Sequence, residues 1–228
     1  MEDNLKKKIK IAEKAAGLYL DNPEFTMKQL AGTMKVKPAD LYGMFPSRKA
    51  LLRFYYTAQF HKYKEVAGQI EGFHEYTLAE KLGNLAYTLT DLMLEHREFV
   101  ERTFDQLIGQ FYTKTDFEKL LEEEIRTFHI NDAKISATAS ILIRPWYFRI
   151  IRQHYLWLIG YWLKDESPGF ENTMSLTDKW TGFLQEMLYS SIVDKGFDLA
   201  KFVFMQSGIK DWFETGETKR KSSATDQP

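Results

Sequence analysis

The sequence lacks the features on which several classes of protein depend. None of its 228 residues is cysteine, which excludes disulfide bonds, thiolate nucleophiles and thiolate zinc sites. No run of about 18 uncharged apolar residues occurs, so we predict no membrane span. There is no phosphate-binding loop, no dinucleotide-binding glycine pattern and no nucleophile elbow. We therefore expect neither an enzyme nor a bound cofactor.

Histidine is also sparse, and its spacing does not favour a metal site. No histidine stands four residues from another, and no carboxylate cluster accompanies them at a metal-ligand spacing. The five histidines are His61, His74, His96, His129 and His154. The acidic run Glu122–Glu124 is predicted to be a solvated helix face.

Charge is unevenly spread along a chain that is otherwise rich enough in apolar residues, at 44%, to build a sizeable core. Residues 1–66 contain 13 Lys and Arg against 7 Asp and Glu, a net charge of +6, whereas the remainder contains 18 against 25, a net charge of −7. A basic segment before an acidic body is typical of a protein whose first part meets a polyanion, although chance clustering of solvated charges gives the same count. The charged N-terminus has no apolar run after it and is not a secretory signal, so we expect a cytoplasmic protein.

Apolar residues recur with a helical period along almost the whole chain, and no run alternates with period two between turn residues. The predicted fold class is therefore all-α. Pro145 is expected to start or kink a helix, and the polar tail 215–228 is expected to be disordered. Helices are predicted near residues 5–20, 26–34, 38–44, 48–68, 77–95, 97–113, 116–129, 132–164, 174–194 and 197–213.

The stretch from Thr26 to Phe45 predicts two short helices joined by a tight turn. Thr26 and Gln29 have the spacing of a capping box, which begins the first helix. Residues 35–37 form the turn, and Pro38 suits the first position of the second helix, where its missing N–H costs nothing. A helix-turn-helix places its second helix in the DNA major groove, where base edges are exposed.

Candidate DNA contacts follow from this geometry. Residues at the start and outer side of the second helix would meet bases, and groups around its rim would meet phosphates. Arg48 lies in the first turn of the next helix, where the helix dipole also favours a phosphate. The candidates are Thr26, Lys28, Lys35, Lys37, Pro38, Ala39, Asp40, Tyr42 and Arg48.

These residues resemble a known pattern, that of the TetR family of bacterial repressors. The match is carried by Thr26, Leu30, Ala31, Val36, Leu41, Tyr42 and Phe45, with Ile9, Ala12, Ala15, Ala16 and Leu18 before them and Pro46, Ser47, Arg48, Leu51 and Leu52 after them. The resemblance implies that Thr26, Tyr42 and Arg48 contact phosphates. It also implies that Lys37, Pro38 and Ala39 contact bases.

The sequence departs from the family pattern at several positions, two of which are Met44 and Lys49, where an aromatic residue and an acid are usual. Lys35 stands where glycine is usual, so it must tolerate an unfavourable backbone angle or change the turn. Lys37 replaces a usual serine, which loses a cap and gains a cation. Asp40 places a carboxylate near the groove, where it can serve the helix N-terminus or accept a hydrogen bond from cytosine.

The same resemblance implies that residues 1–66 are the DNA-binding domain and residues 67–214 a domain for dimerisation and ligand binding. Within the latter, residues 146–163 are apolar almost all round a helix, so they should be buried on several sides. The segment can be plain core, a subunit interface or the wall of a cavity for a hydrophobic ligand with one polar end. The candidate cavity residues are Phe104, Phe111, Tyr112, Trp146, Tyr147, Ile150 and Tyr155.

A second resemblance concerns the stretch after this aromatic helix. It is similar to the C-terminal region of the ubiquinone-biosynthesis lipid-binding proteins, which share the TetR fold, but it is longer between Thr173 and Trp180. The residues concerned are Asp165, Ser167, Pro168, Phe170, Glu171, Thr173, Trp180, Phe183 and Leu184.

Two functions are compatible with the sequence. The first is a homodimeric regulator, a repressor in its usual form, that binds a palindromic operator in double-stranded DNA and responds to a hydrophobic or lipid-like effector. The alternative is a lipid-binding or carrier protein that retains a helix-turn-helix scaffold.

Overall fold

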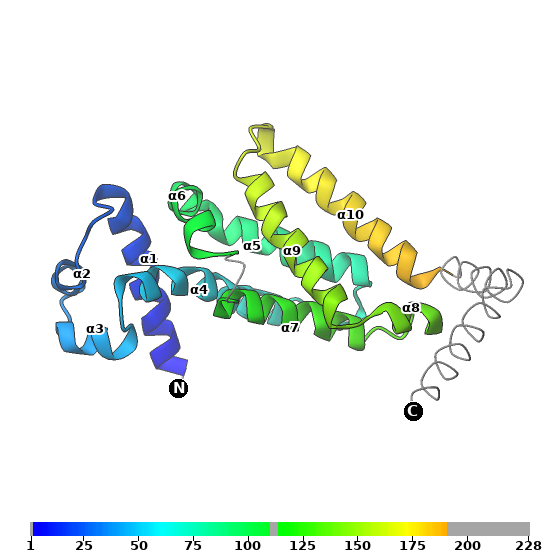
Figure 1. Ribbon diagram of the computed structural model, residues 1–228, viewed down its shortest axis with the longest axis horizontal. Helices are drawn as coiled ribbons and strands as arrows, with labels where there is room; N and C mark the ends of the chain where they lie inside the picture. The colour runs from blue at the N-terminus through cyan, green and yellow to red at the C-terminus, as the bar shows by residue number, and fades with distance from the viewer. Residues whose placement is uncertain (1, 110–113, 191–228) are drawn as a thin grey trace, which may run out of the picture.

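The computed structural model describes residues 2–109 and 114–190, and these residues contain α-helices and two short 3-10 helices but no strand (Figure 1). The predicted all-α fold is confirmed. None of the helices in the described ranges is both long and apolar enough to cross a membrane. The α-helices are α1 (Glu2–Asp21), α2 (Met27–Met34), α3 (Pro38–Met44), α4 (Arg48–Gly68), α5 (Leu78–Leu94), α6 (Arg97–Leu107), α7 (Asp116–Ile130), α8 (Ala137–Leu142), α9 (Pro145–Trp162) and α10 (Glu171–Tyr189), with η1 (Phe73–Glu75) and η2 (Pro168–Phe170).

The first three helices form one end of the molecule, and α4 joins them to the rest. In Figure 1, α2 and α3 lie at the left end of the long axis, and α8 lies near the opposite end. α4 packs against α1 on one side and against α5 and α7 on the other. An ion pair between Lys62 of α4 and Glu13 of α1, with 2.7 Å between Nζ and Oε1, reinforces the first contact. Buried residues of α4 therefore pack against helices at both ends of the molecule.

The acidic run on α7 is not the solvated face that we predicted. Glu124 is buried, and both of its carboxylate oxygens lie 2.8 Å from the Lys64 ammonium on α4. Glu122 accepts hydrogen bonds from Lys114 at 2.7 Å and from the buried Arg152 of α9 at 3.1 Å. Only Glu123 is exposed. The prediction failed because the ion-pair partners come from helices that are distant in sequence.

Several helix limits differ from those expected. α6 ends at Leu107, and Gly109 follows with a φ of 72°, so the predicted helix 97–113 stops early. The predicted segment 132–164 is divided into α8 and α9, with Pro145 as the first residue of α9. The last predicted helix, 197–213, and the tail 215–228 lie outside the described residues.

The corner between α9 and α10 is built from polar side chains. Arg97, the first residue of α6, donates through Nη2 to the carbonyl oxygen of Leu163 at 2.7 Å and to that of Trp162 at 3.3 Å. Asp165 accepts hydrogen bonds from the Ser167 hydroxyl at 2.6 Å and from the Thr173 amide at 2.8 Å, which ties the end of α9 to the first turn of α10. The motif that resembles lipid-binding proteins therefore fixes a helix corner.

We expect the charge of Asp165 to matter for stability at neutral pH. Hydrogen bonds from the Ser167 and Thr173 hydroxyls hold the pKa of Asp165 well below its usual range. A depressed folded-state pKa contributes stability that is present above the unfolded value, near 3.9, and is lost as pH falls through the folded value. Asp165→Asn should therefore lower the urea concentration at the midpoint of unfolding by more at pH 7 than below pH 3. The measurement is urea unfolding of the wild-type protein and of the variant at several pH values across this range.

A matched control for this experiment is Glu166→Gln, which removes the same charge from an exposed neighbour in the same turn. Its urea midpoint at pH 7 should equal that of the wild-type protein. Equal midpoints for Asp165→Asn and Glu166→Gln at pH 7 would contradict the role assigned to Asp165.

Candidate DNA-binding surface and effector hollow

The start of α2 has the capping geometry that the sequence predicted. The Thr26 amide donates to Oε1 of Gln29 at 2.7 Å, and the Gln29 amide donates to the Thr26 hydroxyl at 3.2 Å. Two amides that have no partner within the helix are satisfied in this way. Leu30 and Ala31 are buried and hold the inner side of α2 against its neighbours.

The turn between α2 and α3 keeps its shape although lysine replaces the usual glycine. Lys35 has a φ of 54° and a ψ of 38°, in the left-handed region that favours glycine. Its amide donates to the Gly32 carbonyl at 3.1 Å, and the Val36 amide donates to the Ala31 carbonyl at 3.0 Å. Of the two outcomes left open for Lys35, the structure has the first, an unfavourable backbone angle in an unchanged turn.

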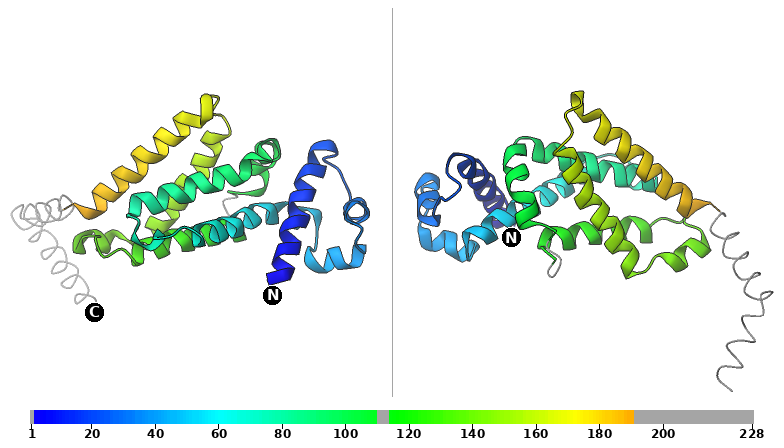
Figure 2. Two further views of the ribbon diagram at one scale, coloured as in Figure 1. Left: turned by 180° about the vertical axis from the view of Figure 1, so that it is seen from behind. Right: turned by 45° about the horizontal axis from the view of Figure 1, so that its top comes forward.

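α3 is pinned by its inner side and exposed on its outer side. Leu41 and Phe45 are buried, with exposed fractions of 0% and 3%. The exposed residues of α3 are Pro38, Ala39, Asp40, Tyr42 and Gly43, and Lys37 before them is exposed too. Figure 2 shows α2 and α3 at the end of the molecule in both views, with no other helix of the described chain lying beyond them. The outer side of α3 is thus open to a partner as large as a DNA groove.

The candidate phosphate-contacting residues differ in whether their side chains already interact within the protein. Lys28, Lys35 and Lys37 are exposed and form no ion pair within the described part of the chain. Lys37 is the N-cap of α3 but gives no side-chain hydrogen bond, as the loss of serine predicted. The Thr26 hydroxyl takes part in the capping box and is still exposed.

Arg48 is used within the protein, which the sequence did not indicate. Its guanidinium donates to the Pro23 carbonyl, lies 3.5 Å from the Glu24 carboxylate and sits 5.7 Å from the centre of the Phe25 ring. These contacts hold the loop between α1 and α2. The next residue, Lys49, is exposed in the first turn of α4 and has no partner among the described residues. In the sequence it differs from the family pattern, which usually has an acid at this position.

The α9 residues proposed as a cavity lining differ in their burial. Tyr147 is buried with its hydroxyl 2.8 Å from Nε2 of His129, and the Tyr155 hydroxyl donates to the Leu82 carbonyl at 2.7 Å. Trp146 and Ile150 point outward, with exposed fractions of 51% and 56%. α9 has one buried side and one exposed apolar side, so these four residues do not share one side of the helix, and their grouping as a ligand site stays a prediction. Phe111 and Tyr112 lie outside the described residues.

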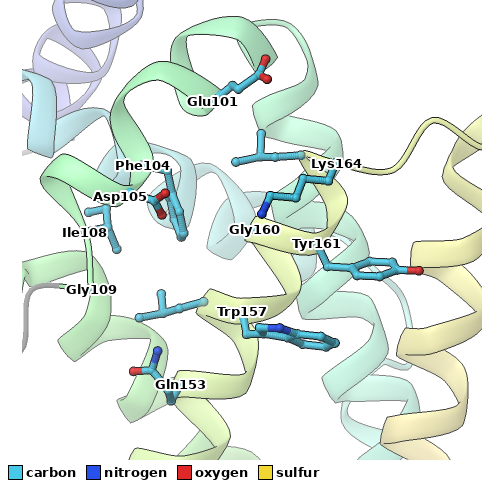
Figure 3. A pocket seen from close by; sticks show the side chains of 12 residues that line it. Glu101, Phe104, Asp105, Ile108, Gly109, Gln153, Trp157, Gly160, Tyr161 and Lys164 are labelled. Carbon is cyan, nitrogen blue, oxygen red and sulfur yellow. The ribbon is translucent and has the colours of Figure 1, made fainter.

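A hollow of about 510 Å³ does lie between α6 and α9, and Phe104 is the one candidate that lines it (Figure 3). Its apolar floor is made by Phe104, Ile108 and Leu156, which are buried. Charged and polar groups surround this floor. They are Glu101 and Asp105 from α6, Gln153 from α9 and Lys164 from the turn after it. Trp157, Gly160 and Tyr161 complete the α9 side.

α6 connects this hollow to the helices that carry the DNA-binding surface. On the side away from the hollow, the Thr103 hydroxyl lies 2.7 Å from the Tyr56 hydroxyl of α4. The Phe99 ring meets Tyr19 of α1 edge to face, with 5.4 Å between the ring centres. A change in the position of α6 would therefore alter its contacts with both α1 and α4.

Comparison with known families agrees with this architecture. The family model described as "Tetracyclin repressor-like, C-terminal domain" matches residues 81–203, more than half of the chain. The chain belongs to the TetR family. The match covers a part of the TetR chain that carries none of the motifs from which the resemblance was first drawn. As a TetR protein it is a transcriptional regulator, and members of this family are in general not enzymes.

A solved structure is similar to this TetR protein in fold. It is the crystal structure of the TetR transcriptional regulator from Nitrosomonas europaea ATCC 19718, with a TM-score of 0.58 and 12% sequence identity. The similarity covers 78% of this chain and 96% of that chain. No curated protein matches the sequence significantly.

The backbone angle of Lys35 leads to a prediction about this TetR protein. Left-handed geometry costs a non-glycine residue roughly 1–2 kcal/mol, whereas glycine adopts it freely but loses more entropy on folding. Lys35→Gly should therefore raise the free energy of unfolding by about 1 kcal/mol or less, measured by urea denaturation. Lys35→Ala removes the same charge but keeps the Cβ atom, so it should give no gain. A gain as large for alanine would show that charge, and not backbone strain, is responsible.

Proposed function

We propose that the protein is a homodimeric repressor of TetR type that binds a palindromic operator and is released by a hydrophobic effector. The observation that carries this proposal is the open outer side of α3, whose inner side is held by the buried Leu41 and Phe45. A helix held in this way can enter a major groove without losing its packing. Residues 1–66, with a net charge of +6, would be the DNA-binding domain, and residues 67–214 the domain for dimerisation and effector binding.

The DNA contacts that we propose divide into two sets. Lys37, Pro38, Ala39 and Asp40 begin the exposed side of α3 and would lie at base edges. The rim would meet phosphates through Thr26, Lys28, Lys35 and Tyr42, to which we add Lys49. We place Arg48 behind this rim, since its guanidinium already holds the loop between α1 and α2.

A dimer would cover the apolar surface of α9 and α10. Trp146 and Ile150 on α9 and Phe183 on α10 are each at least half exposed, with fractions of 51% to 67%. Between the two helices, the His154 ring stacks on Trp180 with 3.9 Å between centres, and burial lowers the pKa of His154 to about 4, so the ring is neutral at physiological pH. An exposed apolar surface of this kind favours a protein partner.

The effector would bind in the hollow between α6 and α9. A ligand there would contact Phe104 and Ile108 on α6, and α6 contacts α4 through Thr103 and α1 through Phe99. Binding one position of α6 better than another would change the distance between the two copies of α3 in a dimer. Such a change would weaken binding to an operator whose half-sites are one helical turn apart.

Selection from random double-stranded DNA tests the proposal directly. The purified full chain should enrich an inverted repeat, because a two-fold symmetric dimer requires two related half-sites. The alternative function, a lipid carrier, predicts no enriched sequence and a lipid that mass spectrometry can identify in the purified protein. That result would overturn the regulator proposal.

Titrations of the selected DNA at several salt concentrations test the rim. Lys28→Gln should weaken binding to specific and random DNA alike, and it should reduce the salt slope by about 0.9 for one lost phosphate contact. Tyr42→Phe should weaken both complexes as well, since it removes a hydroxyl donor. The control is Lys134→Gln, an exposed lysine after α7 and outside both proposed surfaces, which should leave affinity and salt slope unchanged. A slope that does not change in Lys28→Gln would argue against the proposed docking.

Light scattering after gel filtration tests the dimer surface. Phe183→Glu places a charge where the surface should be desolvated, so we expect it to convert the dimer into a monomer at micromolar concentration. Ile130→Glu is the matched control, because Ile130 is a similarly exposed apolar residue, at 70%, on α7. It should remain dimeric. A dimeric Phe183→Glu protein would place the subunit contact elsewhere.

A further inference from the structure

We propose that the hollow between α6 and α9 selects a lipophilic cation. This inference rests on the proposed effector function and names the chemical class of the ligand. The hollow itself, with its buried apolar floor of Phe104, Ile108 and Leu156, is the site. The charges and dipoles around it decide which apolar molecules it takes.

The α6 side of the hollow carries two carboxylates one helical turn apart. Glu101 and Asp105 are exposed, and neither forms an ion pair or hydrogen bond within the described chain. Figure 3 shows Phe104 and Asp105, which are neighbours in sequence, on the α6 side of the hollow. A carboxylate beside an aromatic face favours a cation with apolar substituents, since the charge meets the carboxylate while the substituents cover the ring.

Two helices have their C-terminal ends at this hollow, and the dipole of each helix places a partial negative charge there. Asp105, Ile108 and Gly109 line it at the end of α6, and Tyr161 and Leu163 line it at the end of α9. The C-terminal end of a helix carries a partial negative charge and attracts cations. Neither α6 nor α9 has a basic residue in its last turn. At the end of α9, the Arg97 guanidinium already donates to the carbonyl oxygens of Trp162 and Leu163. The backbone contribution that adds to the two carboxylates therefore comes from the end of α6.

One lysine provides the only cation that lines the hollow among the described residues. Figure 3 shows the Lys164 amine turned toward the α6 side, although it forms no ion pair with either carboxylate. Lys164 partly compensates the negative charge while no ligand is bound. A cationic ligand must compete with Lys164, whereas an anion would be attracted by Lys164 alone and repelled by two carboxylates and the end of α6.

The mouth of the hollow adds apolar surface for the part of a ligand that projects from it. Trp157 and Tyr161 stand one turn apart on α9, with 5.6 Å between their ring centres, and both line the hollow. Their exposed fractions are 51% and 37%. A flat or branched aromatic substituent would cover this surface and remove it from water.

Two probes of the same size and shape but opposite charge test the inference. They are tetraphenylphosphonium, a cation, and tetraphenylborate, an anion, each titrated calorimetrically into the full chain without DNA. We expect the cation to bind about tenfold more tightly than the anion, the effect of two partly exposed carboxylates. Raising the salt concentration should narrow the difference.

Variants assign the preference to the residues named. Glu101→Gln combined with Asp105→Asn should weaken binding of the cation about tenfold, and Lys164→Met should strengthen it about threefold. The charge-matched control is Glu65→Gln combined with Glu71→Gln, two exposed carboxylates of the described chain outside the hollow. This control should bind the cation as the wild-type protein does.

The possible failures are separable from one another. Equal binding of the two probes, or a cation preference that survives in the Glu101→Gln/Asp105→Asn protein, would overturn the cation inference and leave the hollow as a neutral effector site. Binding of neither probe would overturn the inference together with the effector part of the proposed function. A cation that binds as expected but leaves operator affinity unchanged would support the ligand class and reject the role in release.

Discussion

The arrangement depends on the burial of one side of a helix that is too short to be stable alone. α3 has seven residues, and an isolated helix of that length does not form in water. Leu41 and Phe45 attach it to the protein, and Pro38 fixes its first backbone angle. Because these inward side chains, together with the half-buried Met44, provide the attachment, the exposed positions of α3 can differ without removing it.

Through their packing contacts, α4 and α6 connect the end of the molecule that contains α3 to the remaining helices. α4 buries residues against α1 and against α5 and α7, so the end proposed to bind DNA cannot shift without disturbing the central helices. α6 lies on both α1 and α4 and at the same time forms one side of the hollow. A single helix of eleven residues thus separates the ligand from the surface proposed to meet DNA.

The sequence predicted local features well and distant partners poorly. The capping box at Thr26, the proline at the start of α3 and the helical class depend on residues a few positions apart, and all agree with the structure. The burial of Glu124 and the loop contact of Arg48 depend on residues 60 and 24 positions away, which periodicity does not reveal. The aromatic helix misled for a related reason. Its composition is apolar all round, but which rings face inward depends on where α5 and α7 lie.

The contact made by Arg97 has a mechanical consequence for α6. This first residue of the helix is fastened to the carbonyl oxygens at the end of α9, while the last turn borders the hollow. The helix can consequently tilt about its fixed end at Arg97, so that its other end, at Leu107, moves most. A tilt imposed at the Leu107 end moves Thr103 farther than Phe99, so α4 would be displaced more than α1.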